Sequence, residues 1–244
     1  MTNSLLTNSE LPSFSTIEIA DIEPAISQLI ERNKASIEAL LAANTRYTSE
    51  NLLSPIEELD DERSRVFSPV SHLNSVRNSD ELREAYNACL PLLSAYSTWM
   101  GQHQTLFQAY QQIADGDEFA RLQPGQRKAV ENALRDFRLA GVALPDAQKQ
   151  RYGELKKRLS ELGSKFGENV LDATNAWSRE VSKEQLAGLP ESALASARQA
   201  AEQAGKEGYL ITLEFPSYYP VLTYCDDARL RQEVYQANTT RASD

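Results

Sequence analysis

The chain has 244 residues and a mass of 27.2 kDa, and its 25 basic against 35 acidic side chains give a formal net charge of −10 at pH 7. This charge argues against a nucleic acid partner, because such binding relies on Lys and Arg contacts to phosphates. The hydrophobic fraction of 41% can supply a core, yet no apolar run approaches the roughly 20 residues of a membrane span and no basic residue precedes Arg32. We therefore expect a cytoplasmic protein with no membrane partner.

Residues 1–20 show little hydrophobic periodicity and are rich in Ser, Thr and Asn, which predicts an extended N-terminal arm on the surface. A helical bundle is expected over residues 21–207. In its first helix, Pro24 fits the first helical position, and apolar residues at intervals of three or four continue to about Asn44. Thr48 then has a side chain that can cap a short turn.

The next two predicted helices each contain an internal proline. Pro69 should kink or end the first of them, because a proline inside a helix removes a hydrogen bond and crowds the preceding turn. Asn78 fits the cap of the second, whose apolar residues recur every three or four positions as far as Ala114. Pro91 is expected to bend this helix. His103 would lie along its packed face.

The central part of the chain carries the most regular pattern. Pro124 fits the start of a helix, and Gly141 supplies the left-handed residue that often closes one. Apolar residues then repeat with mostly 3-4 spacing from Tyr152 to Val181, which predicts a long helix with an antiparallel partner. Glycines such as Gly163 and Gly167 weaken a free-standing coiled coil, so packing within the chain is the favoured interpretation.

The last part of the chain, residues 208–244, is expected to form a short β element and a final helix. Residues 209–215 alternate between apolar and polar side chains, as a half-buried strand does. This strand is either part of a hairpin packed on the bundle or a strand whose free edge accepts an extended peptide. A Pro-Ser-Tyr-Tyr-Pro turn at 216–220 precedes the final helix, which Asp226 or Asp227 can cap.

These patterns together predict a mostly α-helical fold: an elongated antiparallel helical bundle with long helices and a small β-strand or hairpin element near residues 208–224. The expected order is the arm at 1–20, the bundle at 21–207, and the β element with the final helix at 208–244. No internal repeat or low-complexity linker interrupts this order.

Few residues are candidates for chemistry. His72 and His103 are 31 positions apart and lack the spacing of metal ligands, so both are expected to be structural. The acidic run at 57–62 lacks the Gly turn of a calcium loop and is expected to be a solvated helix face. Cys89 and Cys225 are most simply two reduced thiols. We therefore expect no catalytic, cofactor-binding or metal-binding residue in this chain, and its substrate-binding residues stay unknown.

Several segments carry a resemblance to a known family, chiefly Phe67–Val76, Leu90–Trp99 and Asn132–Pro145. They are similar to the amino-terminal region of the thimet-type zinc oligopeptidases. The similarity runs along the whole chain and includes Arg-Asp-Phe followed by Leu-x-Gly at 135–141 and the segment Tyr209–Val221. The resemblance implies a mostly helical region that forms one wall of a deep channel, through which short peptides but not folded proteins reach the metal.

The resemblance also implies where the chemistry of the parent enzyme lies. In this family zinc is held by a His-Glu-x-x-His helix further along the polypeptide, and no position in 1–244 matches it. By this resemblance the chain is the non-catalytic N-terminal part of a zinc metallo-oligopeptidase and is expected to be inactive alone. Its partners would be the zinc peptidase domain of the same parent chain and, in the parent, oligopeptide substrates. Such a piece should expose an apolar face and self-associate in a non-native way.

Two other interpretations remain open at this point. A stand-alone helical scaffold would bind a partner through an exposed apolar face and would be a complete fold in isolation. A peptidase with an unrecognised metal site would show zinc-dependent cleavage by the chain alone. Binding of a hydrophobic dye and assays with added zinc distinguish these alternatives.

Overall fold

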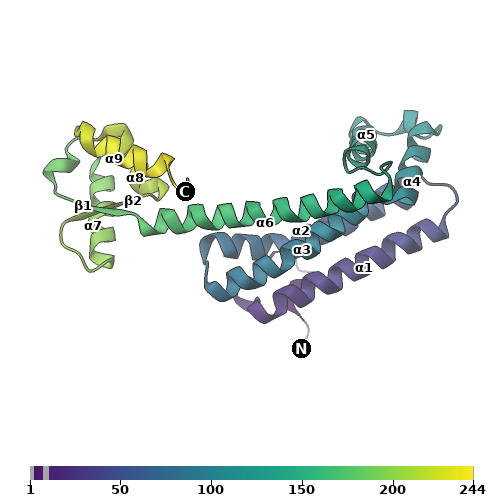
Figure 1. Ribbon diagram of the computed structural model, residues 1–244, viewed down its shortest axis with the longest axis horizontal. Coiled ribbons are helices and arrows are strands. Elements are labelled where there is room, and N and C mark those ends of the chain that lie inside the picture. The colour runs from purple at the N-terminus through teal and green to yellow at the C-terminus, as the bar shows by residue number, and fades with distance from the viewer. Residues whose placement is uncertain (1–2, 8–10, 244) are drawn as a thin grey trace. The chain divides into compact units, whose positions relative to one another are not determined.

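A computed structural model describes residues 3–7 and 11–243, and Figure 1 shows its ribbon. Within these residues the chain is mostly α-helical with one small antiparallel sheet, which confirms the predicted fold class. The α-helices and strands are α1 (Ile22–Ala43), α2 (Ser54–Val76), α3 (Asp80–Gly101), α4 (Gln104–Asp115), α5 (Pro124–Leu139), α6 (Asp146–Ala176), β1 (Ser178–Val181), α7 (Glu191–Gln203), β2 (Tyr209–Thr212), α8 (Phe215–Tyr224) and α9 (Ala228–Thr239).

The chain divides into two compact units, residues 1–161 and 162–244. The division falls within α6. In the second unit, β1 and α7 share one core with β2, α8 and α9. The predicted order of an arm at 1–20, a bundle at 21–207 and a last part at 208–244 stays a prediction.

Unit 1 is built on the apolar faces of its helices. In α1, Ile22, Ile26 and Leu29 are fully or almost fully buried, and their spacing of three and four residues puts them on one side of the helix. This side packs against α2 and α3, which lie beside α1 in Figure 1. A second cluster joins α4 and α5 to the ends of α1 and α2 around Leu106 and Val130. Burial of each such side chain contributes about 1.5–3 kcal/mol.

The described part of the predicted arm is more ordered than an extended segment. It contains three short 3₁₀ turns, at Ser4–Leu6, Phe14–Thr16 and Ile19–Asp21. The side chain of Leu5 is buried among those of α1, α2 and α3, so this part of the arm also packs on the helices. Residues 1–2 and 8–10 of the predicted arm lie outside the described residues.

The sequence predicts that Pro69 kinks or ends its helix. Pro69 does not end the helix, because α2 continues through it to Val76. Pro69 is itself buried, and its neighbours Val66 and Val70 belong to the core, so packing outweighs the lost hydrogen bond. Pro91 likewise lies inside α3.

The helix expected to run as far as Ala114 is divided in two. α3 ends at Gly101 and α4 begins at Gln104, with His103 between them in an extended conformation. A Cβ atom on Gly101 would lie 2.6 Å from the Cβ atom of Ala140, so only glycine permits this close approach. The cap of α3 also differs from the predicted one, because Ser79 rather than Asn78 accepts the backbone N–H of Leu82.

Other boundary predictions are confirmed. Thr48 caps the turn at 49–53 in a reciprocal bond with Asn51. Helix α5 begins at Pro124, and Gly141 has a φ of +82°, the left-handed conformation expected of it. The first helix ends at Ala43 as predicted but begins at Ile22, two residues before Pro24.

Unit 2 contains the sheet. β1 and β2 are antiparallel, with Ser178 opposite Thr212 and Val181 opposite Tyr209. The predicted strand is therefore present as β2. Its partner, β1, comes before α7 in the chain. Val181, which was expected in the long helix, belongs to β1. The predicted turn at 216–220 is also wrong, because those residues form part of α8. The final helix, α9, begins after Asp227, whose carboxylate accepts the N–H groups of Arg229 and Leu230, as expected of a cap.

Candidate interaction surface

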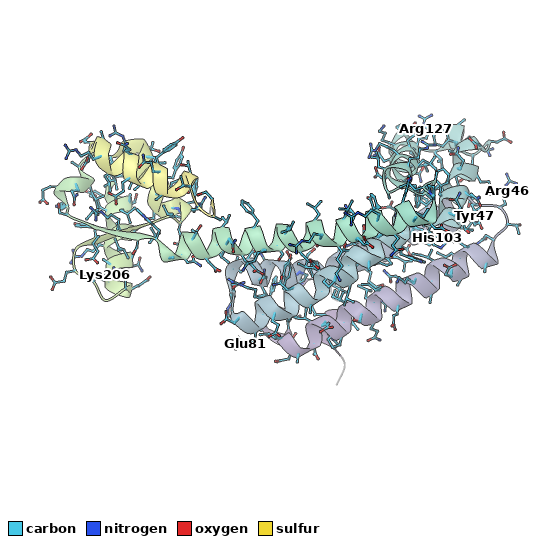
Figure 2. The ribbon with its side chains drawn as sticks, in the orientation of Figure 1. Arg46, Tyr47, Glu81, His103, Arg127 and Lys206 are labelled. Carbon is cyan, nitrogen blue, oxygen red and sulfur yellow. The ribbon has the colours of Figure 1, made fainter. Side chains whose placement is uncertain are left out.

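The two histidines are held by separate local contacts. The exposed ring of His72 lies 5.6 Å from the ring of Phe14, measured between centroids. His103, labelled in Figure 2, caps α4: its Nδ1 atom accepts the N–H of Leu106, and its Nε2 atom lies 2.9 Å from Oε1 of Glu38. His103 therefore lies at a helix start and not, as predicted, along a helix face. Within residues 3–7 and 11–243, no group of three or more His, Cys, Asp or Glu side chains could hold a metal.

The acidic run at 57–62 is neutralised in part by basic side chains of unit 1. Asp60 lies 2.6 Å from Arg63, and Asp61 lies 2.7 Å from Arg65, one helical turn away in each case. All four side chains are substantially solvent-exposed, so each pair contributes only a few tenths of a kcal/mol. The arrangement is that of a solvated helix face, as the sequence suggested.

Both cysteines are free and buried. Burial is the main cause that raises the pKa of the Cys89 thiol to about 11, and the nearby carboxylate of Glu23 adds to it. Burial also raises the pKa of Cys225, whose Sγ atom donates to the carbonyl oxygen of Gln185. Thiols that stay protonated and inaccessible at neutral pH are poor nucleophiles.

The strand β2 offers little to an incoming peptide at its carboxyl end. The N–H group of Thr212 already donates to Oγ of Ser217 in α8, at 2.9 Å. The partner strand β1 is exposed, but its side chains Arg179 and Glu180 are charged, and charges on a short edge strand discourage further strand pairing. These features argue against a strand whose free edge pairs with an extended peptide.

Helix α6 is the feature that most distinguishes this chain. None of its 31 residues is buried. Four apolar side chains spaced 4-3-4 lie on one side of the helix, and all are exposed: Leu155 (53%), Leu159 (64%), Leu162 (49%) and Phe166 (60%). We call these four residues the α6 stripe. Their spacing predicts packing within the chain, whereas all four side chains are exposed in the structure.

A second exposed apolar group lies in unit 2, on α8. The rings of Phe215 and Tyr219 stack at 4.8 Å, and both are at least half exposed. The segment Phe215–Tyr224 contains no charged residue, which is unusual for an exposed helix. That lack of charge was the sequence signal for this surface, and it was missed because the two prolines suggested a turn.

The described helices give no indication of a membrane segment: none is long and apolar enough to span a bilayer. Exposed apolar side chains such as those on α6 and α8 are candidates for contact with another polypeptide surface.

Comparisons with known proteins agree with the resemblance noted in the sequence. Oligopeptidase A from Salmonella typhimurium is 54% identical over 245 residues, and oligopeptidase A from Escherichia coli K12 is 55% identical over 245 residues. Each match covers 100% of this chain but 36% of the relative. A probable cytosolic oligopeptidase A from Arabidopsis thaliana is 32% identical over 249 residues, which covers 99% of this chain and 35% of that protein. The chain thus spans about a third of the length of the curated relatives it matches.

The family assignment rests on a match over half of the chain. The profile described as "Neurolysin/Thimet oligopeptidase, N-terminal domain" matches residues 26–149, which run from α1 into the start of α6. Because this match and the bacterial relatives agree, the chain belongs to the neurolysin/thimet oligopeptidase family, of which it represents the N-terminal domain.

Proposed function

We propose that this chain is the non-catalytic, N-terminal helical region of a cytoplasmic zinc metallo-oligopeptidase that cleaves short peptides. The observation that carries the proposal is the match of the whole chain to about a third of each bacterial oligopeptidase A, at 54% and 55% identity. In this proposal the remaining two thirds of the polypeptide supply the catalytic residues.

Among the described residues there is no group of three or more His, Cys, Asp or Glu side chains that could hold a metal ion. His72 and His103 are held by separate contacts to Phe14 and to Glu38, and both thiols are buried. Zinc would polarise the scissile carbonyl and activate water in such an enzyme. The proposal places the metal and the water that it activates in the remainder of the polypeptide.

The role proposed for the chain itself is mechanical. Helices that form one wall of a channel exclude folded substrates, whereas an extended peptide can pass. Rigid helical packing suits this role, and unit 1 has it, since two clusters of buried side chains join α1 to α5. The exposed α6 stripe is also more compatible with one part of a larger protein than with a complete scaffold.

A chimeric enzyme tests the proposal. This chain would replace the matching N-terminal 36% of the Escherichia coli oligopeptidase A. We expect the chimera to hydrolyse short peptides in a zinc-dependent way and to leave a folded protein intact. A correctly folded chimera without peptidase activity would contradict the proposed function, and cleavage of folded protein would contradict the size restriction.

A further inference from the structure

We propose that unit 1 contains a binding site for a small organic cation, an apolar group that carries a protonated amine, at the seam between its two cores. Every residue of this site lies between Ile37 and Ala140, inside unit 1. The inference goes beyond the proposed function and does not depend on it, because it names a ligand of the helical region itself.

Two neighbouring cavities provide the space. The first, of about 270 Å³, is lined by residues of α1, α2 and α3, and the second, of about 290 Å³, by residues of α3, α4 and α5. Ser97 and Met100 line both cavities, so the two lie on either side of the same turn of α3. A methionine side chain changes its rotamer easily, and Met100 can therefore join them into one pocket of the size that takes a small molecule.

The position of these cavities explains why they remain unfilled by the chain. Unit 1 has two clusters of buried side chains, one around Leu106 and one around Leu29, and Met100 packs against both. The cavities lie where these clusters meet. Walls that face a void lose dispersion contacts, which costs stability. A ligand that fills the void would restore those contacts and stabilise the folded chain.

Most of the lining suits an apolar group. Phe137 of α5 and Leu106 of α4 lie in the wall of the second cavity, which is otherwise formed mainly by small or apolar residues. The apolar side chains that line the first cavity are Ile37, Ile56, Leu59, Leu93 and Met100. A ligand without an apolar body would leave these walls unfilled.

Tyr110 supplies a hydrogen-bonding group that lacks a partner. It lines the second cavity and is only 3% exposed, yet its hydroxyl forms no hydrogen bond with another described residue. Burial is the main cause that raises the pKa of Tyr110, and the negative charges of Glu57 and Asp60 add to it. The hydroxyl is therefore neutral and lies within the field of these carboxylates. A buried hydroxyl without a partner costs about 1–3 kcal/mol, and an ammonium group would supply the missing donor.

Glu57 favours a cation over an anion. It lines the first cavity and forms no ion pair within the described part of the chain. Asp60 and Arg63 line the same cavity but pair with each other at 2.6 Å, and Asp136 in the second cavity pairs with Arg135 at 2.9 Å. Glu57 therefore remains the carboxylate whose charge is not balanced locally, and a protonated amine complements it.

The methionine methyl groups give a direct test. The chain has two methionines, Met1 and Met100, so isotope labelling of their methyl groups gives two NMR signals, which Met100→Leu assigns. The probes are phenethylamine, phenethyl alcohol and phenylpropionate, which are similar in size but positive, neutral and negative. We expect phenethylamine to shift the Met100 signal saturably and to bind about tenfold more tightly than the alcohol, and phenylpropionate not to bind.

Variants of the charged and hydroxyl groups locate the site. Glu57→Gln should weaken binding of phenethylamine several-fold, because it removes the balancing charge. The matched control is Glu58→Gln, which makes the same change at the next residue and lines neither cavity, so it should leave binding unchanged. Tyr110→Phe keeps the ring and should also weaken binding. Circular dichroism checks that each variant is folded.

The possible outcomes decide the proposal. A Met100 signal that does not shift saturably with phenethylamine would overturn it. Equal affinities for the amine and the alcohol would show an apolar cavity without preference for a cation and would also overturn it, as would equal effects of Glu57→Gln and Glu58→Gln.

A further pair of probes identifies the source of the amine. The dipeptide amide Phe-Ala-NH₂ has a free amino terminus, and its N-acetyl form does not. Binding of the free form alone would support the proposal with the first residue of a peptide as ligand. Binding of phenethylamine but of neither dipeptide would support it with a free amine as ligand. Equal binding of both dipeptides would contradict the need for a positive charge.

Discussion

The Nε2 atom of His103 lies 2.9 Å from Oε1 of Glu38, while the other ring nitrogen accepts the N–H of Leu106. One side chain thus caps α4 and binds α1. The ring also meets Trp99 edge-on, with centroids 4.9 Å apart. This residue explains why a helix that looks continuous in the sequence is divided, since the imidazole replaces a backbone partner at the start of α4.

Replacement of His103 should destabilise unit 1. We expect His103→Ala to lower the free energy of unfolding by about 1–2 kcal/mol, because it removes a cap and a second hydrogen bond. His103→Asn can still cap α4 but is too short for Glu38, so it should recover part of the loss. Denaturant unfolding measures both variants, and an alanine variant as stable as the wild type would show that the contact is not formed in solution.

Gly188 should be much less tolerant of substitution than Gly205. Both have positive φ, +90° and +68° respectively, but a Cβ atom at 188 would collide with the carbonyl oxygen of Tyr224, whereas one at 205 would meet nothing. We expect Gly205→Ala to cost about 1 kcal/mol and Gly188→Ala at least about 3 kcal/mol. Thermal unfolding followed by circular dichroism compares them, and similar losses would contradict the close packing at Gly188.

The raised pKa of Cys89 predicts a loss of stability at alkaline pH. The thiol has a pKa of about 11 in the folded chain against 9.0 without burial, so the folded state holds the proton more tightly. The contribution of Cys89 is therefore fully present below pH 9 and is lost as pH rises towards 11. Cys89→Ala removes this titration.

The matching measurement compares the two proteins at several pH values. We expect the difference in unfolding free energy between the wild type and Cys89→Ala to be constant up to about pH 9 and then to shift by up to ~3 kcal/mol in favour of the variant. A difference that stays constant from pH 8 to pH 11 would show that Cys89 is accessible to solvent.

Polar substitution on the α6 stripe should leave the isolated chain stable. We expect Leu159→Asp to change the free energy of unfolding by about 0.5 kcal/mol or less, since the side chain is 64% exposed. Leu106→Ala, which truncates a fully buried side chain, should cost about 2–5 kcal/mol. Leu159→Asp should also reduce binding of a hydrophobic dye. A large destabilisation by Leu159→Asp would mean that the stripe is packed in solution.

Local sequence signals predicted local structure well. Thr48 and Asp227 cap the elements that follow them, and Gly141 adopts a left-handed conformation. Each of these depends on one side chain and its immediate neighbours, so a single sequence is sufficient to find it. The mostly helical fold followed from hydrophobic periodicity in the same way.

Features that depend on distant contacts were predicted less well. Pro69 is accepted inside α2 because its neighbours are buried, and the partner of β2 is a strand on the other side of α7. The spacing of the apolar residues from Leu155 to Phe166 correctly predicted a helix. It also predicted a packed face, whereas these side chains are exposed. Periodicity alone does not tell which surface covers an apolar face.

The proposal that this chain is one part of a longer peptidase is tested most directly by the coding sequence beyond Asp244 in the source genome. We predict that the reading frame continues into a His-Glu-x-x-His helix with a further glutamate downstream, as a zinc peptidase requires. A stop codon directly after Asp244 would contradict the claim and would make the chain a stand-alone helical protein.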